Sequence, residues 1–506
     1  MVGWAQQPPE PPPNAGAPPG TPPGASGTPP EGAPGPPQFA GPPYKLLRED
    51  EDWGYLSNPA LGRDWLDPIK YIPLGQNPRW YLTLGGEIRQ WFEDFHNENW
   101  GAAPAVDNAY LLERYMLNAD FHFGKRFRFF IQLKSGIENG RAGGPRPQID
   151  EDRLDFNSAF FDINLDLNEK EQPNVTLRVG RQELHYGTGR MVSAREGPNV
   201  RQPFDGARLI FNTHGWRIDT FAVKPVITDP GVFDDAPDHT QSFWGVYGTG
   251  NLPSVPFKLD LYYLGLDRKS FFYNKGIGRE QRHSIGARIS KGGPVYVPGH
   301  GLDYDLEAAF QFGTFGPGVF LSFSPAGLQP IGPMGRGDIR AWTFGGDVGY
   351  SFENVRLQPR LGLTTGITSG DHNPHSPGLD TFAPPFPNGH YFGAIQQNGP
   401  FNVEGLRPNL IVRLPHRSMF TADCYFFWRE SLNDGFYNIA GFLLRPAGTN
   451  LARYIGSQPQ VEYMVPVSNH ITVDFIYAFF QAGPYLQQSP PGQNLRYAGF
   501  FFDYKF

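Results

Sequence analysis

Six arginines between residues 178 and 208 are the residues of this sequence best suited to bind an anion. An arginine side chain carries a planar guanidinium group that pairs with a carboxylate through two hydrogen bonds and stays charged at any physiological pH. A carboxylate-bearing solute is therefore the ligand that this stretch favours. The candidate site comprises these arginines, the acidic residues among them and one asparagine: Arg178, Arg181, Glu183, Arg190, Arg195, Glu196, Asn199, Arg201, Asp205 and Arg208.

Basic residues elsewhere share a polar strand face and complete this candidate site: Arg114, Arg128, Lys134 and Arg360. Acidic residues on the same faces nearly cancel their charge, and strand 126–134 would set its cations against Asp162 and Asp166 of strand 159–167. The alternative interpretation is therefore a lattice of cross-strand ion pairs that keeps the wall rigid. Both interpretations stay open for each residue.

Sequence motifs of catalysis are missing. The chain has no Gly-x-Ser-x-Gly elbow, no His-Glu-x-x-His, no phosphate-binding glycine loop and no Cys–His metal spacing. His372 and His375 form a short His-x-x-His, but its Pro-rich surroundings favour a solvent loop before a strand near residue 390 over a metal site. Cys424 stands in an aromatic strand as a small apolar residue. We expect neither enzymatic activity nor a cofactor.

The elements that carry these charges follow a period of two from Trp80 onward. Residues 115–123 alternate apolar side chains with Arg114, Asn118, Asp120 and His122, and a Gly124-Lys125 turn leads into a second strand of the same kind. The alternation continues over 159–167, over 302–311 and in a strand that would include Leu357 and Arg360. Each strand thus has one apolar face and one strongly polar face.

Aromatic residues decide between a soluble β-sandwich and a membrane barrel. They cluster at strand ends, as the girdles at a membrane interface do. The last strand carries one aromatic face and ends on a phenylalanine, like the terminal strands of bacterial outer-membrane proteins: Phe500, Phe502, Tyr504 and Phe506. The pattern predicts a single-chain antiparallel transmembrane β-barrel of the all-β class.

Composition agrees with strands and turns, because the chain has 62 Gly, 52 Pro and 15% aromatic residues. No run of 18 apolar residues occurs and mean hydropathy is −0.43, which excludes a helical membrane protein but not a barrel. The net charge of −7 excludes a nucleic-acid binder with a broad basic face.

Three regions follow from these patterns. Residues 1–45 form a Pro- and Gly-rich leader, predicted to be disordered, which serves either as a periplasmic tether or as an unstructured tail. Gly3-Trp4-Ala5 has the form of a signal-peptidase site at the end of a truncated signal. Residues 46–75, with the acidic run Glu49–Asp52, are expected at the periplasmic mouth of the barrel, and residues 76–506 form the barrel.

Three blocks of the barrel region resemble the alginate export family. Residues 177–209 read LRVGRQELHYGTGRMVSAREGPNVRQPFDGARL. Residues 113–116 (ERYM) and 132–136 (QLKSG) form the second block, and residues 380–382 (DTF) and 386–393 (FPNGHYFG) the third. The resemblance implies a barrel of about eighteen strands with an electropositive lumen that conducts an anionic polysaccharide.

In the strand that carries Arg178, the alternation of side chains does not show clearly which face Arg181 and Glu183 occupy. Val175, Leu177 and Val179 would face lipid, and strict alternation would place Arg181 and Glu183 there too. Either a β-bulge follows Gly180 or these residues lie beyond the hydrocarbon. We favour a bulge or an inward-folded segment, because residues 187–203 have the Gly, Pro and Asn content of a loop. Such a segment would constrict the pore.

The main functional hypothesis is a bacterial outer-membrane channel for export or diffusion of an anionic, alginate-like polysaccharide or oligosaccharide, with the 178–208 arginines setting its selectivity. A general small-solute porin and a structural anchor for the Pro-rich tail are the alternatives. The expected partners are an anionic glycan, outer-membrane lipid and periplasmic export proteins, with no nucleic acid, and the chain is expected to be a monomer.

Overall fold

The computed structural model describes residues 44–506, apart from residues 63, 167–173, 253–255, 292–300, 325–326 and 449–450. The disordered leader predicted for residues 1–45 therefore lies, up to residue 43, outside the described residues.

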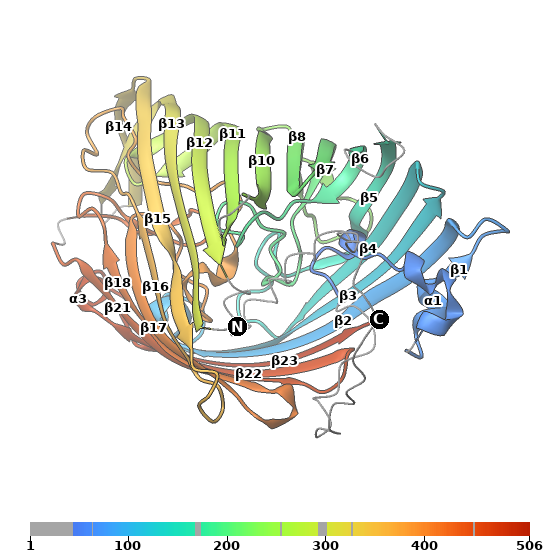
Figure 1. Ribbon diagram of the computed structural model, residues 1–506. Helices are drawn as coiled ribbons and strands as arrows, with labels where there is room; N and C mark the ends of the chain where they lie inside the picture. Colours follow the sequence, from blue (N-terminus) through green and yellow to red (C-terminus); the bar gives the residue numbers. More distant parts are fainter. Residues whose placement is uncertain are drawn as a thin grey trace.

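Eighteen antiparallel strands in the described part of the chain close into one barrel (Figure 1). β2 pairs with both β3 and β23, which closes the sheet and sets Ile88 opposite Tyr504. The predicted all-β barrel of about eighteen strands is confirmed. The wall consists of β2 (Trp80–His96), β3 (Asp107–Phe123), β4 (Phe127–Asn139), β5 (Asp152–Asp166), β6 (Asn174–Glu183), β7 (Pro203–Thr213), β8 (Trp216–Ile227), β10 (Gln241–Asn251), β11 (Lys258–Tyr273), β12 (Gly276–Lys291), β13 (Gly301–Ser324), β15 (Gly337–Ser351), β16 (Arg360–Thr368), β17 (Val403–Arg413), β18 (Met419–Arg429), β21 (Tyr454–Pro466), β22 (Ile471–Ala482) and β23 (Leu495–Lys505).

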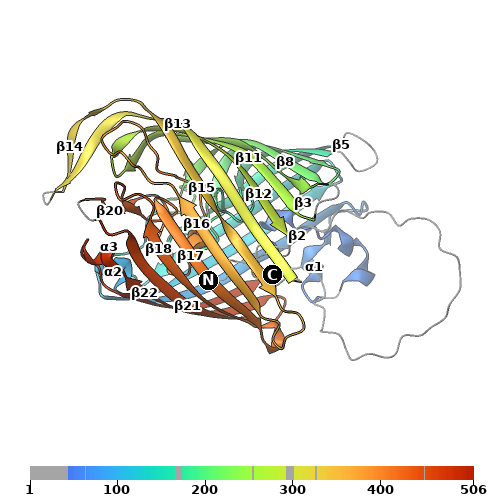
Figure 2. The same ribbon diagram turned by 60° about the vertical axis from the view of Figure 1, so that its left-hand side comes forward.

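The remaining elements are short. β14 (Gly327–Met334) pairs with the far end of β13, and this hairpin stands out beyond the barrel (Figure 2). None of the helices in the described ranges is long and apolar enough to cross a membrane. The other elements are β1 (Ile72–Pro73), β9 (Ala236–Pro237), β19 (Phe436–Tyr437), β20 (Leu443–Arg445), α1 (Asp67–Lys70), α2 (Glu98–Gly101), α3 (Pro484–Gln487) and the 3-10 turns η1 (Arg48–Asp50), η2 (Gly54–Ser57), η3 (Pro59–Leu61), η4 (Gly389–Phe392) and η5 (Pro415–Arg417).

The two faces of the wall differ as the alternation predicts. On β3 the outward Leu117 is 52% exposed, whereas the inward Arg114 is 1% exposed. On β23 Phe500 points outward and Phe501 and Asp503 are buried inside. An apolar face of this kind is stable against lipid tails, and the inward polar residues are covered by neighbouring side chains and loops. The strand pattern and the terminal aromatic face are thus both present.

Two predicted strand segments are wrong. The strand expected to include Leu357 begins only at Arg360, because Leu357 and Gln358 lie in a turn with φ of 69° and 41°. No strand begins near residue 390, where the chain instead forms η4. Residues 369–402 between β16 and β17 fold back against the inside of the barrel, and Phe382 and Phe392 are buried there.

The bulge expected after Gly180 is also absent. β6 pairs with β5 and with β7 without a shift of register. The irregularities lie one strand earlier, where β5 shifts against β4 beside Gln132 and again beside Lys134. Arg181 and Glu183 therefore keep their parity, and they stand at the very end of β6, where loop segments replace lipid as their neighbours.

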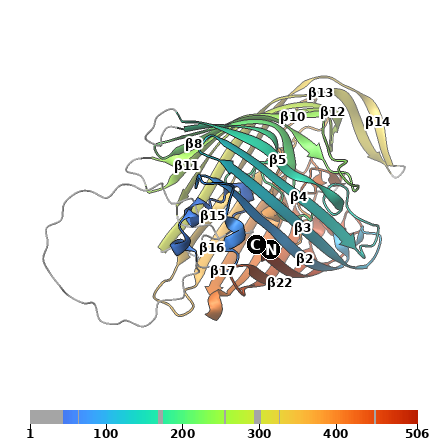
Figure 3. The same cartoon turned by 90° about the vertical axis from the view of Figure 1, so that its right-hand side faces the viewer.

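The barrel has one end with short turns and one end with long loops. Gly124-Lys125 and His214-Gly215 lie in turns at the first end. Phe506 lies at the same end. The N-terminal segment from Tyr44 to Tyr71 packs at this short-turn opening, beside the end of the chain (Figure 3). Arg48 donates hydrogen bonds to the backbone oxygens of Gly86 and Phe506, both at 2.9 Å.

Candidate functional site

Two loops from the long-loop end fold into the barrel and pair with each other. We call residues 184–202 the first inward loop and residues 369–402 the second inward loop. Val192 forms a parallel β-bridge with Phe386. The amide of Ser193 donates to the Phe386 oxygen at 2.8 Å, and the Phe386 amide donates to the Met191 oxygen at 3.0 Å. The expectation of an inward-folded segment after β6 is therefore correct.

Arginines of the wall hold the first inward loop by its backbone. Arg89 of β2 is fully buried and donates to the backbone oxygens of Glu196 and Pro198, both at 2.7 Å. Our sequence interpretation left Arg89 out of the candidate site, and its place on the polar face of β2 beside Glu87 was the only signal available.

Glu196 is the centre of a buried charge network. Arg114 of β3 contacts both Glu87 and Glu196 at 2.5 Å. Arg201 lies 2.7 Å from Glu183 and 3.1 Å from Glu196. All five side chains are less than 5% exposed. Two arginines and three carboxylates thus join the wall to the loop, which makes them structural partners of one another.

Asn199 connects the same loop to three backbone segments. Its Nδ2 donates to the oxygens of Glu113 at 3.0 Å, Ile137 at 3.2 Å and Asp150 at 2.8 Å. An amide group has only two N–H bonds, so these three acceptors share them. The geometry assigns Asn199 to loop positioning.

A second group of candidate residues lies nearer the short-turn end. Arg178 pairs with Asp162 at 2.9 Å, and Arg128 pairs with Asp120 at 2.7 Å. Arg208 pairs with Asp219 on the neighbouring β8. These contacts are the cross-strand ion pairs that the alternation of charged side chains predicted.

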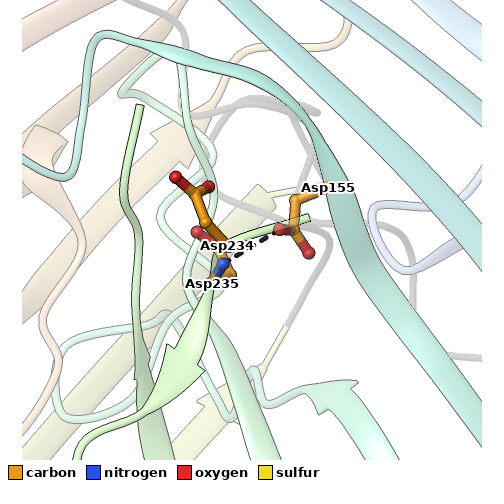
Figure 4. Close-up of side chains that lie close together, drawn as sticks. All are labelled: Asp155, Asp234 and Asp235. Atoms are coloured by element: carbon orange, nitrogen blue, oxygen red, sulfur yellow. Dashed lines mark hydrogen bonds between the residues drawn. The ribbon is translucent and has the colours of Figure 1, made fainter. Parts of the chain in front are cut away.

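A third group, at the long-loop end, has more carboxylates than cations. Arg181 pairs with Asp205 at 2.9 Å and Lys134 pairs with Asp235 at 2.8 Å. Figure 4 shows Asp155, Asp234 and Asp235 close together, with one carboxylate oxygen of each within 4.8 Å of the others. The Asp235 amide donates to Asp155 at 3.0 Å, and Arg181 reaches Asp155 at 3.2 Å. Two cations already face this cluster, which favours a loop anchor over a cation site.

Arg360 lies apart from these groups. It bridges Asp303 of β13, at 2.5 Å, and Asp347 of β15. A Cβ atom added to Gly349 would lie 2.1 Å from the Arg360 guanidinium group, so the glycine leaves room for it. His372 and His375 are exposed in the second inward loop, whereas the neighbouring Asp371 is buried and pairs with Lys275.

Arg195 differs from the paired arginines. It sits on the first inward loop with φ of 56°, and within the described residues no acidic side chain contacts its guanidinium group. Burial lowers the pKa of Arg195 to about 10, which leaves it charged at neutral pH. Arg190 on the same loop lies against Gly345 of β15, where an added Cβ would meet its Nη2 at 2.1 Å.

A family comparison matches most of the barrel. The sequence model described as alginate export matches residues 80–500. Among curated proteins, no sequence matches the chain significantly.

Solved structures of similar fold are outer-membrane-type barrels of low sequence identity. Pseudomonas aeruginosa OccK2 (OpdF) has a TM-score of 0.53 at 12% identity, covering 84% of this chain and 97% of that one. Acinetobacter baumannii OccAB2 has a TM-score of 0.52 at 10% identity, covering 84% and 98%. A second OccK2 structure, in complex with glucuronate, has a TM-score of 0.51 at 11% identity, covering 84% and 98%.

Proposed function

The chain belongs to the alginate export family, and from this membership we propose that it passes an anionic polysaccharide or oligosaccharide through the bacterial outer membrane. The family and the closed barrel establish an outer-membrane channel. In such barrels the short turns face the periplasm and the long loops face the outside. The N-terminal segment then lies at the periplasmic mouth.

The observation that carries the selectivity proposal is Arg195. Most arginines of the candidate site are matched by wall carboxylates, so they contribute little net field. Arg195 lies on a loop that folds into the barrel, is partly buried and has no acidic contact within the described residues. A cation held in a narrow, partly dehydrated passage attracts anions and repels cations much more strongly than one in bulk water. The first inward loop would then form the constriction.

Planar-bilayer recording of the full chain tests this function. We expect a reversal potential that indicates anion preference in a salt gradient, and current block by oligouronates but not by neutral oligosaccharides. Arg195→Glu should move the reversal potential towards cations and weaken the block about tenfold or more. Arg340→Glu, at an exposed position of β15, is the matched control and should change neither value.

A small-solute porin is the second candidate, and the close pairing of the wall arginines favours it. Glucuronate would then pass and compete with chloride, while longer oligouronates would not block. A pore without conductance would support the structural anchor instead. Cation preference in the wild-type channel would rule out the arginine constriction.

A further inference from the structure

The acidic run near the N-terminus lies inside the barrel opening, among arginines. The run starts at η1, where Arg48 is fixed to Gly86 and Phe506. Just before it, the Leu46 oxygen accepts a hydrogen bond from Arg201 at 2.9 Å. The segment therefore bridges the wall at the short-turn end and the first inward loop.

Glu49 of this run contacts the lumen wall, and Asp50 follows it in the chain. Glu49 is 2% exposed, its Oε1 lies 3.2 Å from Nη1 of Arg178, and its backbone oxygen accepts from Arg128 at 2.6 Å. Burial alone would raise the pKa of Asp50, but Arg217, Arg178 and Arg208 hold it below its usual range. The Glu49 carboxylate thus rests against the guanidinium group of Arg178, and the Asp50 carboxylate is stabilised by the charge of the arginines around it.

The arginines involved come from four wall strands and outnumber their wall partners. Arg128 of β4, Arg178 of β6, Arg208 of β7 and Arg217 of β8 pair with three aspartates of the wall: Asp120, Asp162 and Asp219. Arg208 and Arg217 share Asp219, so this group carries one positive charge in excess when the acidic run is left out. A surplus of this kind attracts an added anion.

The fit of Glu49 is incomplete. Its Oε2 is buried without a hydrogen-bond partner within the described residues, and burial raises the pKa of Glu49. A buried carboxylate oxygen without a donor costs free energy. Only one of the two Glu49 carboxylate oxygens is thus bound by an arginine. A ligand whose carboxylate used both oxygens would bind the four arginines more tightly and replace the segment.

We infer that Arg128, Arg178, Arg208 and Arg217 form an anion-binding site at the periplasmic end of the lumen, specific for successive carboxylates, which Glu49 and Asp50 occupy as a tethered ligand. A polyuronate, with one carboxylate on each sugar, is the class of molecule that displaces them. This ligand class rests on the proposed function, whereas the site itself rests on the contacts above.

Neutralising the two carboxylates tests the site. The double variant Glu49→Gln/Asp50→Asn leaves the arginines without their internal ligand. We expect its reversal potential to shift further towards anions and the half-blocking concentration of a uronate hexamer to fall about tenfold. Asp52→Asn is the matched control, because this residue of the same run is exposed. Identical selectivity and block in the double variant and the control would overturn the inference. Heat-modifiable gel migration shows that each variant has a closed barrel.

A second measurement uses the wild-type chain. Displacement of the segment should expose Lys45 and Arg48, so uronate hexamer should speed tryptic cleavage there severalfold, and a neutral hexamer should not. Unchanged cleavage at concentrations that block the current would contradict displacement. If the hexamer never blocks any variant, the proposed function fails. The chloride selectivity of Glu49→Gln/Asp50→Asn would then still support or overturn the arginine site by itself.

Discussion

Individual charges in the lumen are stabilised mainly by one another. Arg114 has two carboxylate partners, Glu87 and Glu196, and all three side chains are buried. A buried ion pair adds little net stability compared with apolar residues, but removal of one partner leaves an uncompensated charge. The effect of a substitution therefore depends on whether its partner remains.

Arg114→Met should destabilise the barrel by about 3–5 kcal/mol, because Glu87 and Glu196 lose their shared cation. Guanidinium unfolding of the detergent-solubilised protein, followed by tryptophan fluorescence, measures this. Arg279→Met removes an exposed pair with Asp267 and should leave the midpoint unchanged. Equal effects of the two substitutions would contradict the network assignment.

Lys70 gives the N-terminal segment a pH dependence. Burial lowers the pKa of Lys70 to about 7 from its ordinary 10.5. Between these values the undocked segment binds a proton that the docked segment does not, so docking strengthens by up to about tenfold per pH unit as pH rises above 7. Below pH 7 both states bind the proton, so docking is weakest there and nearly independent of pH. Hydrogen exchange of residues 44–71 at pH 6 and pH 9 checks this. In Lys70→Met the docking equilibrium should no longer depend on pH, and a persisting dependence would point to another group.

At the scale of elements, the inward loops explain what sequence patterns could and could not predict. Alternation along each strand is local, so the strands and their inner faces were predictable. The bridge between Val192 and Phe386 joins residues far apart in the chain, and nothing near either residue specifies it. A bulge was expected after Gly180 because alternation put Arg181 and Glu183 on the lipid face, whereas the observed shifts lie between β4 and β5 and depend on the pairing of those two strands. Strand order predicted that Arg128 faces Asp162, which lies 3.7 Å away, but it could not show that Arg128 pairs more closely with Asp120.

Asn199 should control the mobility of the first inward loop. Asn199→Ala leaves three buried backbone oxygens without this donor, at a cost of about 1–3 kcal/mol. We expect faster tryptic cleavage after Arg190 and Arg195 and noisier single-channel current. Asn212→Ala, which removes a contact with Asn174 near a turn, serves as control and should leave both readouts unchanged. Unchanged cleavage and current in Asn199→Ala would show that the arginine contacts alone hold the loop.

For the whole molecule, stability depends on the seam between β2 and β23. Gly86 and Phe506 exchange two backbone hydrogen bonds there, at 2.8 and 3.0 Å. A Cβ atom on Gly86 would lie 2.4 Å from the Met116 oxygen and 2.6 Å from the Phe506 ring. Position 86 therefore requires a glycine, because both Met116 of β3 and Phe506 lie too close for a side chain there.

Gly86→Val should lower the fraction of closed barrel after refolding into detergent or liposomes severalfold, because backbone atoms cannot give way. Heat-modifiable migration on gels quantifies that fraction. Gly335→Val, where an added Cβ meets nothing within 4 Å, should refold like wild type. If Gly86→Val closed as well as wild type, the close approach at Gly86 would not be needed for the pairing of β2 with β23.

The contacts of Arg48 also set an order of events during biogenesis. Its two acceptors, on Gly86 and Phe506, come together only when the first and last wall strands have paired. Gly86 and Phe506 belong to strands that meet only when the sheet closes, so the acidic run cannot dock in full on a half-inserted barrel. Docking thus reports completed closure, and under the inferred anion site Glu49 and Asp50 already occupy the four arginines when the barrel first closes.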